Sequence, residues 1–131
     1  MVQISDSVDA LLRQPVFVQL GTVRPDGQPQ VNPMWFVWDG EFIWFTHTSF
    51  RQKYKNVQHE PRVSIAFLDP ASPYGYVEVR GVVERIDPDP EALLYQRLSE
   101  HYNGTAVVPE DAKDRVAIAV RPTKVTDARK A

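Results

Sequence analysis

Residues 16–47, VFVQLGTVRPDGQPQVNPMWFVWDGEFIWFTH, contain three runs rich in β-branched, aromatic and other apolar residues. Such runs are typical of β-strands. They cover residues 16–23, 30–38 and 41–47. Between them stand Pro25-Asp26-Gly27-Gln28 and Asp39-Gly40, whose residue types favour tight turns. This stretch therefore predicts three strands that follow one another as a meander.

Three more strands are expected in the second half of the chain. Residues 62–68 and 76–86 have a similar composition. The segment between them, residues 69–75, contains two prolines and a glycine and is expected to form a loop too long for a tight hairpin. Residues 115–126 alternate apolar and other side chains, which predicts the last strand.

Short helices are expected where apolar residues recur at helical spacing beside start and stop signals. Asp6 or Ser5 can cap the first helix, which Pro15 ends. The second and third helices are predicted over residues 50–60 and 87–102. The buried stripe of the third helix is predicted to consist of Leu93, Leu94 and Leu98.

These elements predict a single domain over residues 1–131 that is mainly β, or α+β by content. Six antiparallel strands are expected to close into a barrel, because closure removes the unpaired edges of the sheet. The strand–helix alternation of a Rossmann domain and its Gly-x-Gly-x-x-Gly turn are missing. Nicotinamide is therefore not the first-choice cofactor.

The composition argues against several classes of function. Hydrophobic residues make up 43% of the chain and charged residues 24%, as in a folded globular protein. The formal net charge of −2 argues against nucleic acid or a membrane surface as a partner. Without a long apolar segment, the expected location is cytoplasmic. With no cysteine and three scattered histidines, neither thiol chemistry nor a metal site is expected.

One segment carries the residue types of a phosphate site. Thr46, Thr48 and Ser49 offer hydroxyl groups at the end of a predicted strand, and the following helix start offers unpaired backbone N–H groups. Arg51 and Lys53 add positive charge at the same place. The alternative interpretation is a solvated, charged helix face with a Thr/Ser cap. Residue chemistry alone does not decide between the two.

A second segment is a strand interrupted by proline. Pro33 cannot donate a ladder hydrogen bond, which indicates a sheet edge or a place where a ligand meets the backbone. The neighbouring Met34, Trp35, Phe36 and Trp38 could form an apolar wall for a flat ring system. The alternative is that these side chains belong to the core.

The order of these motifs along the chain resembles a known family. The motifs are Arg24-Pro25-Asp26-Gly27-Gln28-Pro29-Gln30, a Pro-Met-Trp strand, Trp-Asp-Gly, Phe-Thr followed by Arg-Gln-Lys and Asn, and Glu60-Pro61-Arg62-Val63-Ser64. They resemble the pyridoxamine 5'-phosphate oxidase-like flavin and deazaflavin oxidoreductases. The short chain and its Asn-Pro-Met-Trp-Phe segment are most similar to the F420-dependent reductases of group B from actinobacteria. The resemblance implies a split β-barrel of the FMN-binding type and a homodimer with two cofactor sites at its interface.

The resemblance also implies a set of cofactor-binding residues. The phosphate-binding segment of the family falls on Thr46, His47, Thr48, Arg51, Gln52 and Lys53. The ring-facing strand falls on Val31, Asn32, Pro33, Met34 and Trp35. The partner subunit is expected to contribute the strand near Tyr76 and Arg80, with Tyr74 if its loop folds inward. This chain has Asn32 and Pro33 where pyridoxamine phosphate oxidases carry basic residues, and it lacks their C-terminal extension, so oxidation of vitamin B6 is not expected.

The function implied by the resemblance is reduction of a small organic substrate. Reduced coenzyme F420 would donate a hydride from C5 of its deazaflavin to an unsaturated acceptor such as an enone, a quinone or a tetrapyrrole-like compound. The alternatives are an FMN-dependent oxidoreductase on the same scaffold and a non-catalytic carrier of F420 or haem. Lys55 and Arg13 are candidate cations for the oligoglutamate tail of F420. No catalytic residue is assigned.

Overall fold

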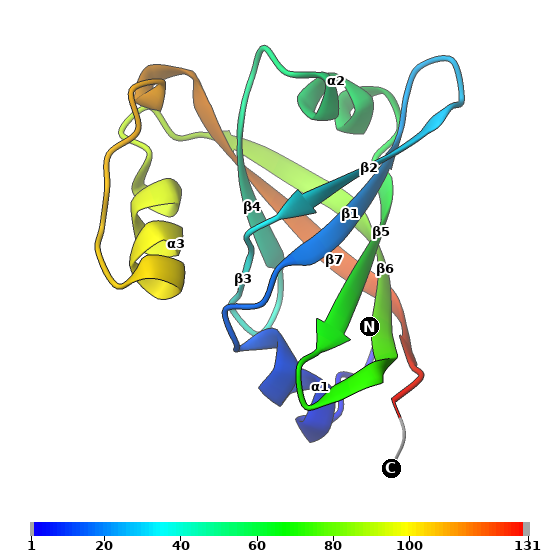
Figure 1. Cartoon of the computed structure of the whole chain (residues 1–131). Helices are drawn as coiled ribbons and strands as arrows, with labels where there is room; N and C mark the ends of the chain where they lie inside the picture. Colours follow the sequence, from blue (N-terminus) through cyan, green and yellow to red (C-terminus); the bar gives the residue numbers. More distant parts are fainter. Residues whose placement is uncertain (1, 130–131) are drawn as a thin grey trace.

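The computed structural model describes residues 2–129, and within them seven strands form one curled antiparallel sheet flanked by three α-helices (Figure 1). The strands are β1 (Val18–Val23), β2 (Pro29–Met34), β3 (Val37–Trp38), β4 (Ile43–Thr48), β5 (Arg62–Asp69), β6 (Ser72–Pro88) and β7 (Arg115–Asp127). The helices are α1 (Asp6–Leu12), α2 (Gln52–His59) and α3 (Leu93–Asn103), with a short 3₁₀ helix at Ala112–Asp114. No helix among residues 2–129 has the length and apolar character needed to cross a membrane.

The order of strands in the sheet is β2-β1-β5-β6-β7-β4-β3. The two edge strands, β2 and β3, are consecutive in the chain and are joined by Trp35 and Phe36 alone. The sheet therefore curls until its edges meet, which produces a barrel with a seam. This confirms the predicted split-barrel class. Helices α1 and α2 lie at opposite ends of the barrel, and α3 stands against its side (Figure 1).

The described part of the chain has seven strands where the sequence predicts six, and the predicted meander breaks at one point. Residues 30–38 are expected to form one strand, but β2 pairs with β1 and β3 pairs with β4. The chain leaves one edge of the sheet and joins the other at Phe36, whose N–H group bonds to the Tyr102 hydroxyl at 3.1 Å instead of to a strand. Because β-branched and aromatic residues continue through this break, the sequence pattern does not reveal it.

The interior of the barrel is filled by large side chains with at most 2% exposure, including Phe36, Phe45, Phe67, Ile43 and Ile65. The rings of Phe36 and Phe67 meet edge to face at 5.1 Å, a favourable aromatic geometry. At one end, α1 closes the core with Val8, Leu11 and Leu12. The Ser5 side chain accepts a hydrogen bond from the Val8 N–H group at 3.2 Å, so it is the helix cap expected from the sequence.

Two connections differ from the sequence-based expectation. The segment after β5 is a tight turn, because the Asp69 carboxylate accepts a hydrogen bond from the Ala71 N–H group at 2.9 Å and Ser72 already pairs with Asp69. Helix α3 begins at Leu93 and not at residue 87, because β6 stays paired with β7 as far as Pro88. Leu98 is buried as predicted, whereas Leu93 is 61% exposed and does not belong to the buried stripe.

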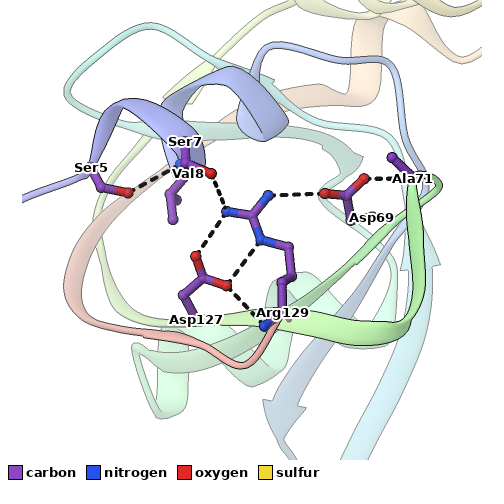
Figure 2. A network of polar contacts seen from close by, with 7 residues as sticks. All are labelled: Ser5, Ser7, Val8, Asp69, Ala71, Asp127 and Arg129. Atoms are coloured by element: carbon purple, nitrogen blue, oxygen red, sulfur yellow. Dashed lines mark hydrogen bonds and ion pairs between the residues drawn. The ribbon is translucent and has the colours of Figure 1, made fainter. Parts of the chain in front are cut away.

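The α1 end of the barrel is held by a network of polar contacts around Arg129 (Figure 2). The guanidinium group of Arg129 donates to the Asp69 carboxylate at 2.9 Å and to the Asp127 carboxylate at 2.8 Å. It also donates to the Ser7 hydroxyl at 2.9 Å, on helix α1. The Arg129 side chain is 10% exposed. This cluster, the Arg129 clamp, joins the first helix, the β5–β6 turn and the segment that follows β7.

Candidate functional site

The seam of the barrel contains a pocket of about 320 Å³ near the α2 end. Strand β4 pairs with β7 along its whole length but with β3 only at Ile43 and Trp44, so Phe45–Thr48 have a strand neighbour on one side only. Strand β2 likewise pairs only with β1 among the strands of the sheet. The pocket is lined by Phe17, Pro33, Met34, Trp35, Thr46, His47, Arg51, Lys53 and Arg115. The two unpaired strand edges therefore border one hollow.

Three consecutive residues of β4 carry buried polar atoms without a partner. Among residues 2–129, the buried side-chain atoms that make no hydrogen bond are Thr46 Oγ1, His47 Nε2 and Thr48 Oγ1. A buried polar group without a partner costs about 1–3 kcal/mol, and such groups are rare in native proteins. Thr46 and His47 line the pocket, and their unpartnered atoms indicate a place prepared for a polar ligand.

The pocket is positively charged and its charge is only partly compensated. Within residues 2–129, neither Arg51 nor Lys53 forms an ion pair with a carboxylate. The half-buried Lys53 ammonium group has the Met34 thioether as its partner, with Nζ 3.3 Å from Sδ. Burial lowers the pKa of Lys53, and the charge of Arg51 lowers it further. An anion bound in this pocket would offset both the burial of the Lys53 charge and its repulsion by Arg51.

The same buried, positively charged surroundings lower the pKa of His47. Burial lowers the pKa of His47 to about 3, with smaller contributions from the positive charges of Lys53, Arg51 and Arg115. The imidazole is therefore neutral at neutral pH and offers one N–H donor. Arg115 differs from the other cations because Asp111 neutralises it through two hydrogen bonds of 3.0 and 3.3 Å. The uncompensated positive charge of the pocket is therefore that of Arg51 and Lys53.

Helix α2 holds these cations in place through a buried amide network. Asn56 is fully buried, and its Nδ2 group donates to Thr22 Oγ1 at 3.0 Å and to Gln30 Oε1 at 3.1 Å. Gln52 donates to Asn56 Oδ1 at 2.8 Å. Arg51, at the N-cap position of α2, makes no side-chain capping bond, so N–H groups of the first turn lack a side-chain partner there. The fixed helix start adds backbone donors and its dipole to the positive pocket.

A second part of the pocket wall is aromatic, in contrast to the basic start of helix α2. Trp35 stacks on Tyr102 of α3, with ring centroids 5.0 Å apart and an angle of 16° between the planes. Phe17, which is 63% exposed, contacts the same tyrosine at 5.8 Å. Tyr95 meets Trp35 at 6.1 Å and lies under the Arg115 guanidinium group. The site therefore combines a cationic part with an apolar, aromatic part.

The structure brings together seven of the residues that the sequence assigns to cofactor binding: Pro33, Met34, Trp35, Thr46, His47, Arg51 and Lys53. Thr48 is adjacent to them on β4 but does not line the pocket. Gln52 is turned to Asn56 and Asn32 accepts a hydrogen bond from Gln30, so neither faces the pocket in this chain.

Other predicted residues lie elsewhere on the molecule. Val31 and Arg80 line a separate surface groove of about 450 Å³ over β1, β2, β5 and β6. Tyr76 is exposed on β6, and Tyr74 is 95% exposed and does not fold inward. The candidate tail cation Arg13 is engaged by Asp9 at 3.1 Å beside α1, at the opposite end of the barrel from α2 (Figure 1).

Sequence analysis does not identify Arg115 and Phe17 as pocket residues. Arg115 faces Thr48 across the β4–β7 ladder, a pairing between residues far apart in the chain. A basic residue at the start of a predicted strand carries no signal of that pairing. Phe17 stands in an apolar run that is typical of a strand, and its exposure, which marks a binding surface, is a property of the folded chain alone.

Comparison with known proteins supplies the family context. The family model described as "Pyridoxamine 5'-phosphate oxidase" matches residues 4–128. The chain has no match among curated proteins. A solved structure named "F420 Reductase" shares 49% sequence identity, with a TM-score of 0.89, and the match covers 94% of this chain and 98% of that chain. A conserved hypothetical protein from Mycobacterium tuberculosis shares 27% identity with a TM-score of 0.81, covering 98% of this chain and 86% of that one.

A more distant structure shares the fold alone. The heme storage protein HutZ from Vibrio cholerae is 18% identical, with a TM-score of 0.68, and the match covers 97% of this chain and 96% of that chain.

Proposed function

The chain belongs to the pyridoxamine 5'-phosphate oxidase family, and from that premise we propose that it is a reductase that uses the deazaflavin coenzyme F420. One observation carries the proposal: a pocket at the barrel seam is lined by two uncompensated cations, Arg51 and Lys53, and by Thr46 and His47, each with an unpartnered buried polar atom. The 49% identity to a structure named "F420 Reductase" supports F420 as the cofactor. FMN is the alternative, because it also carries a phosphate and a tricyclic ring.

Arg51 and Lys53 are the residues that would hold the phosphate. Both cations lack a carboxylate partner within residues 2–129, and charge-assisted hydrogen bonds to phosphate are stronger than neutral ones. The unpartnered hydroxyl group of Thr46 and the backbone N–H groups at the start of α2 would complete the donor set. This set fits an anion with several acceptor oxygens and explains why the charge is left uncompensated by the protein itself.

The apolar part of the pocket fits the ring system. Pro33, Met34 and Trp35 border the seam, where the edge of β2 has no further strand to pair with. Free backbone groups of β2 and β4 can meet the polar edge of a flat ring, and Pro33 and Met34 can contact its apolar face. When bound, reduced F420 supplies a hydride from C5 to an unsaturated acceptor. The chain contributes orientation and the exclusion of water.

Within residues 2–129, the pocket lining offers no carboxyl group and no protonated imidazole to complete the reduction. The pocket lining contains no carboxylate, and His47 is neutral at neutral pH because its pKa is about 3. The Tyr102 hydroxyl is committed to the Val16 carbonyl oxygen at 2.7 Å, and burial raises the pKa of Tyr102 to about 12. We therefore expect solvent to supply the proton that follows the hydride.

A second copy of the chain is proposed to complete each site. The pocket is open at the seam, and the predicted contributors Tyr76 and Arg80 lie on another surface of the same chain. We propose that in a dimer these residues would contact the partner's pocket. Analytical ultracentrifugation at micromolar concentration should show a dimer. A monomer that binds cofactor with full affinity would contradict this part of the proposal.

The cofactor assignment is tested by titrating the purified protein separately with F420 and with FMN. We expect F420 to bind at least about tenfold more tightly than FMN, and reduced F420 to be consumed in the presence of enones or quinones. Tighter binding of FMN would replace F420 by FMN in the proposal. Tight binding of F420 without turnover of any acceptor would indicate a carrier, and haem titration would then identify a haem carrier.

A further inference from the structure

Helix α3 contacts the pocket wall through two aromatic side chains, Tyr95 and Tyr102, and Tyr102 makes the closer, stacked contact with Trp35. The ring of Tyr102 stacks on Trp35 at 5.0 Å and contacts Phe17 at 5.8 Å. Both of these aromatic residues line the pocket, whereas Tyr102 does not. The tyrosine therefore supports the wall from behind.

The hydroxyl group of Tyr102 joins two backbone segments that are distant in the sequence. It accepts a hydrogen bond from the Phe36 N–H group at 3.1 Å and donates one to the Val16 carbonyl oxygen at 2.7 Å. Val16 precedes Phe17, and Phe36 follows Trp35. One hydroxyl group thus determines the backbone position next to each of the two wall residues.

These bonds are made where the sheet cannot make them. Phe36 lies in the two-residue link between β2 and β3, and Val16 lies before β1 begins. Because burial raises the pKa of Tyr102 to about 12, the hydroxyl keeps its proton and donates at any physiological pH. Without it, the backbone groups beside the wall would lose a partner and gain freedom to move.

We infer that Tyr102 is a positioning residue that fixes Trp35 and Phe17 as a rigid wall for the acceptor. The inference rests on the proposed function for the identity of the acceptor. The exposed Phe17 forms the outer part of this wall, and the phosphate part of the pocket is built separately by α2. Loss of the hydroxyl should therefore disturb the acceptor more than the cofactor phosphate.

The variant Tyr102→Phe tests the role because it keeps the ring and removes the hydroxyl. Two control variants come from the same helix. Tyr95→Phe removes a hydroxyl that makes no hydrogen bond within residues 2–129, from a ring that also contacts Trp35. Ser99→Ala removes the 2.6 Å hydrogen bond from the buried Ser99 hydroxyl to the Thr105 carbonyl oxygen, and so weakens α3 without touching the wall.

The first readout needs no cofactor. In protein labelled with 5-fluorotryptophan, the ¹⁹F resonance of Trp35 is identified by its loss in Trp35→Phe. We expect Tyr102→Phe to shift or broaden this resonance, and Tyr95→Phe and Ser99→Ala to leave it in place. An unchanged Trp35 resonance in Tyr102→Phe would overturn the inference. So would an equal change in Ser99→Ala, because the effect would then report only the attachment of α3.

The second readout uses the F420-loaded enzyme. Tyr102→Phe should raise the acceptor KM or lower kcat by about tenfold, while the Kd for F420 stays within about twofold of the wild type. A parallel loss of F420 affinity and acceptor turnover would contradict a wall specific to the acceptor. If the wild-type protein binds neither F420 nor FMN, the proposed function fails, but the ¹⁹F experiment still decides whether Tyr102 fixes the wall.

Discussion

The two ends of the barrel treat positive charge in opposite ways. At the α1 end, the Arg129 guanidinium group is bonded to Asp69, Asp127 and the Ser7 hydroxyl (Figure 2). At the α2 end, the half-buried Lys53 ammonium group has only the Met34 sulfur atom as a hydrogen-bond partner among residues 2–129, and Arg51 makes no ion pair there.

This difference separates charges that hold the protein together from charges that await a ligand. A cation surrounded by its own carboxylates contributes to folding, and its removal leaves those carboxylates exposed to mutual repulsion. A cation left without a carboxylate in a partly buried place opposes folding slightly and is stabilised only by an anion from outside. The two ends should therefore respond differently to the same kind of substitution.

The largest effect is expected at the paired end. Arg129→Met removes one partner from a cluster in which the arginine is 10% and Asp69 is 15% exposed. We expect the free energy of unfolding to fall by about 2–3 kcal/mol, measured by urea denaturation, with no change in cofactor affinity. Arg62→Met is the matched control, because the Arg62–Glu60 pair is on the surface and its loss should leave the melting temperature nearly unchanged. Equal losses of stability in the two variants would show that the Arg129 clamp stabilises the fold no more than a surface ion pair does.

At the unpaired end, Lys53→Ala should have the reverse profile. We expect cofactor affinity to fall about 10- to 100-fold, corresponding to about 1.5–3 kcal/mol, because a charge-assisted contact to phosphate is lost. The melting temperature should stay the same or rise. Arg97→Ala, which removes an exposed cation of α3 that does not line the pocket, is the control and should leave both quantities unchanged. Loss of stability without loss of affinity in Lys53→Ala would show that Lys53 is structural.

The pH dependence of stability gives a third test. The pKa of His47 is about 3 in the folded protein and about 6.5 in the unfolded chain, so below about pH 6.5 the unfolded chain binds a proton that the folded protein does not. Stability from this group is complete above pH 6.5 and is lost as the pH falls. Between pH 7 and pH 5 the loss should be about 2 kcal/mol.

The measurement compares urea denaturation at pH 7 and pH 5 in three proteins. His47→Gln should lose this part of the pH dependence, whereas His59→Gln, which changes an exposed residue of α2, should keep it. Parallel pH profiles for the wild type and His47→Gln would mean that the buried imidazole does not titrate as described.

The smallest effect concerns a single hydroxyl group. Thr46→Val replaces an unpartnered buried hydroxyl by a methyl group of similar size, so stability should rise by about 0.5–1 kcal/mol while cofactor affinity falls a few-fold. The same substitution at Thr22 should lower stability by about 1–2 kcal/mol, because Thr22 Oγ1 accepts a hydrogen bond from Asn56. If both variants lose stability alike, Thr46 is not held for a ligand.

The features that sequence predicts well are those decided by neighbouring residues. Gly27 has a φ of +89°, and the Arg24 N–H group bonds to the Gln28 carbonyl oxygen at 2.9 Å, as expected for the turn in this segment. The cationic part of the pocket is equally local, because Thr46, Arg51 and Lys53 lie within one strand end and the next helix start. Local chemistry is enough to bring these groups near one another.

The features that sequence misses depend on contacts between distant segments. Nothing in residues 30–38 indicates that the chain changes sheet edges at Phe36, because the bond that accommodates the change comes from Tyr102. Arg115 reaches the pocket through its pairing with Thr48. A propensity is a property of one segment, whereas a register or a hydroxyl bridge is a property of two.

The Arg129 clamp also has a consequence for the order in which the protein can be made. Arg129 follows the last strand, and its partner Ser7 lies in the first helix, 122 residues earlier. Translation at about 5–20 residues per second places roughly 6–24 s between their synthesis. During that interval the apolar face of α1 has no completed barrel end to cover. A nascent chain that stalls before β7 would expose Val8, Leu11 and Leu12 to chaperones and to other nascent chains.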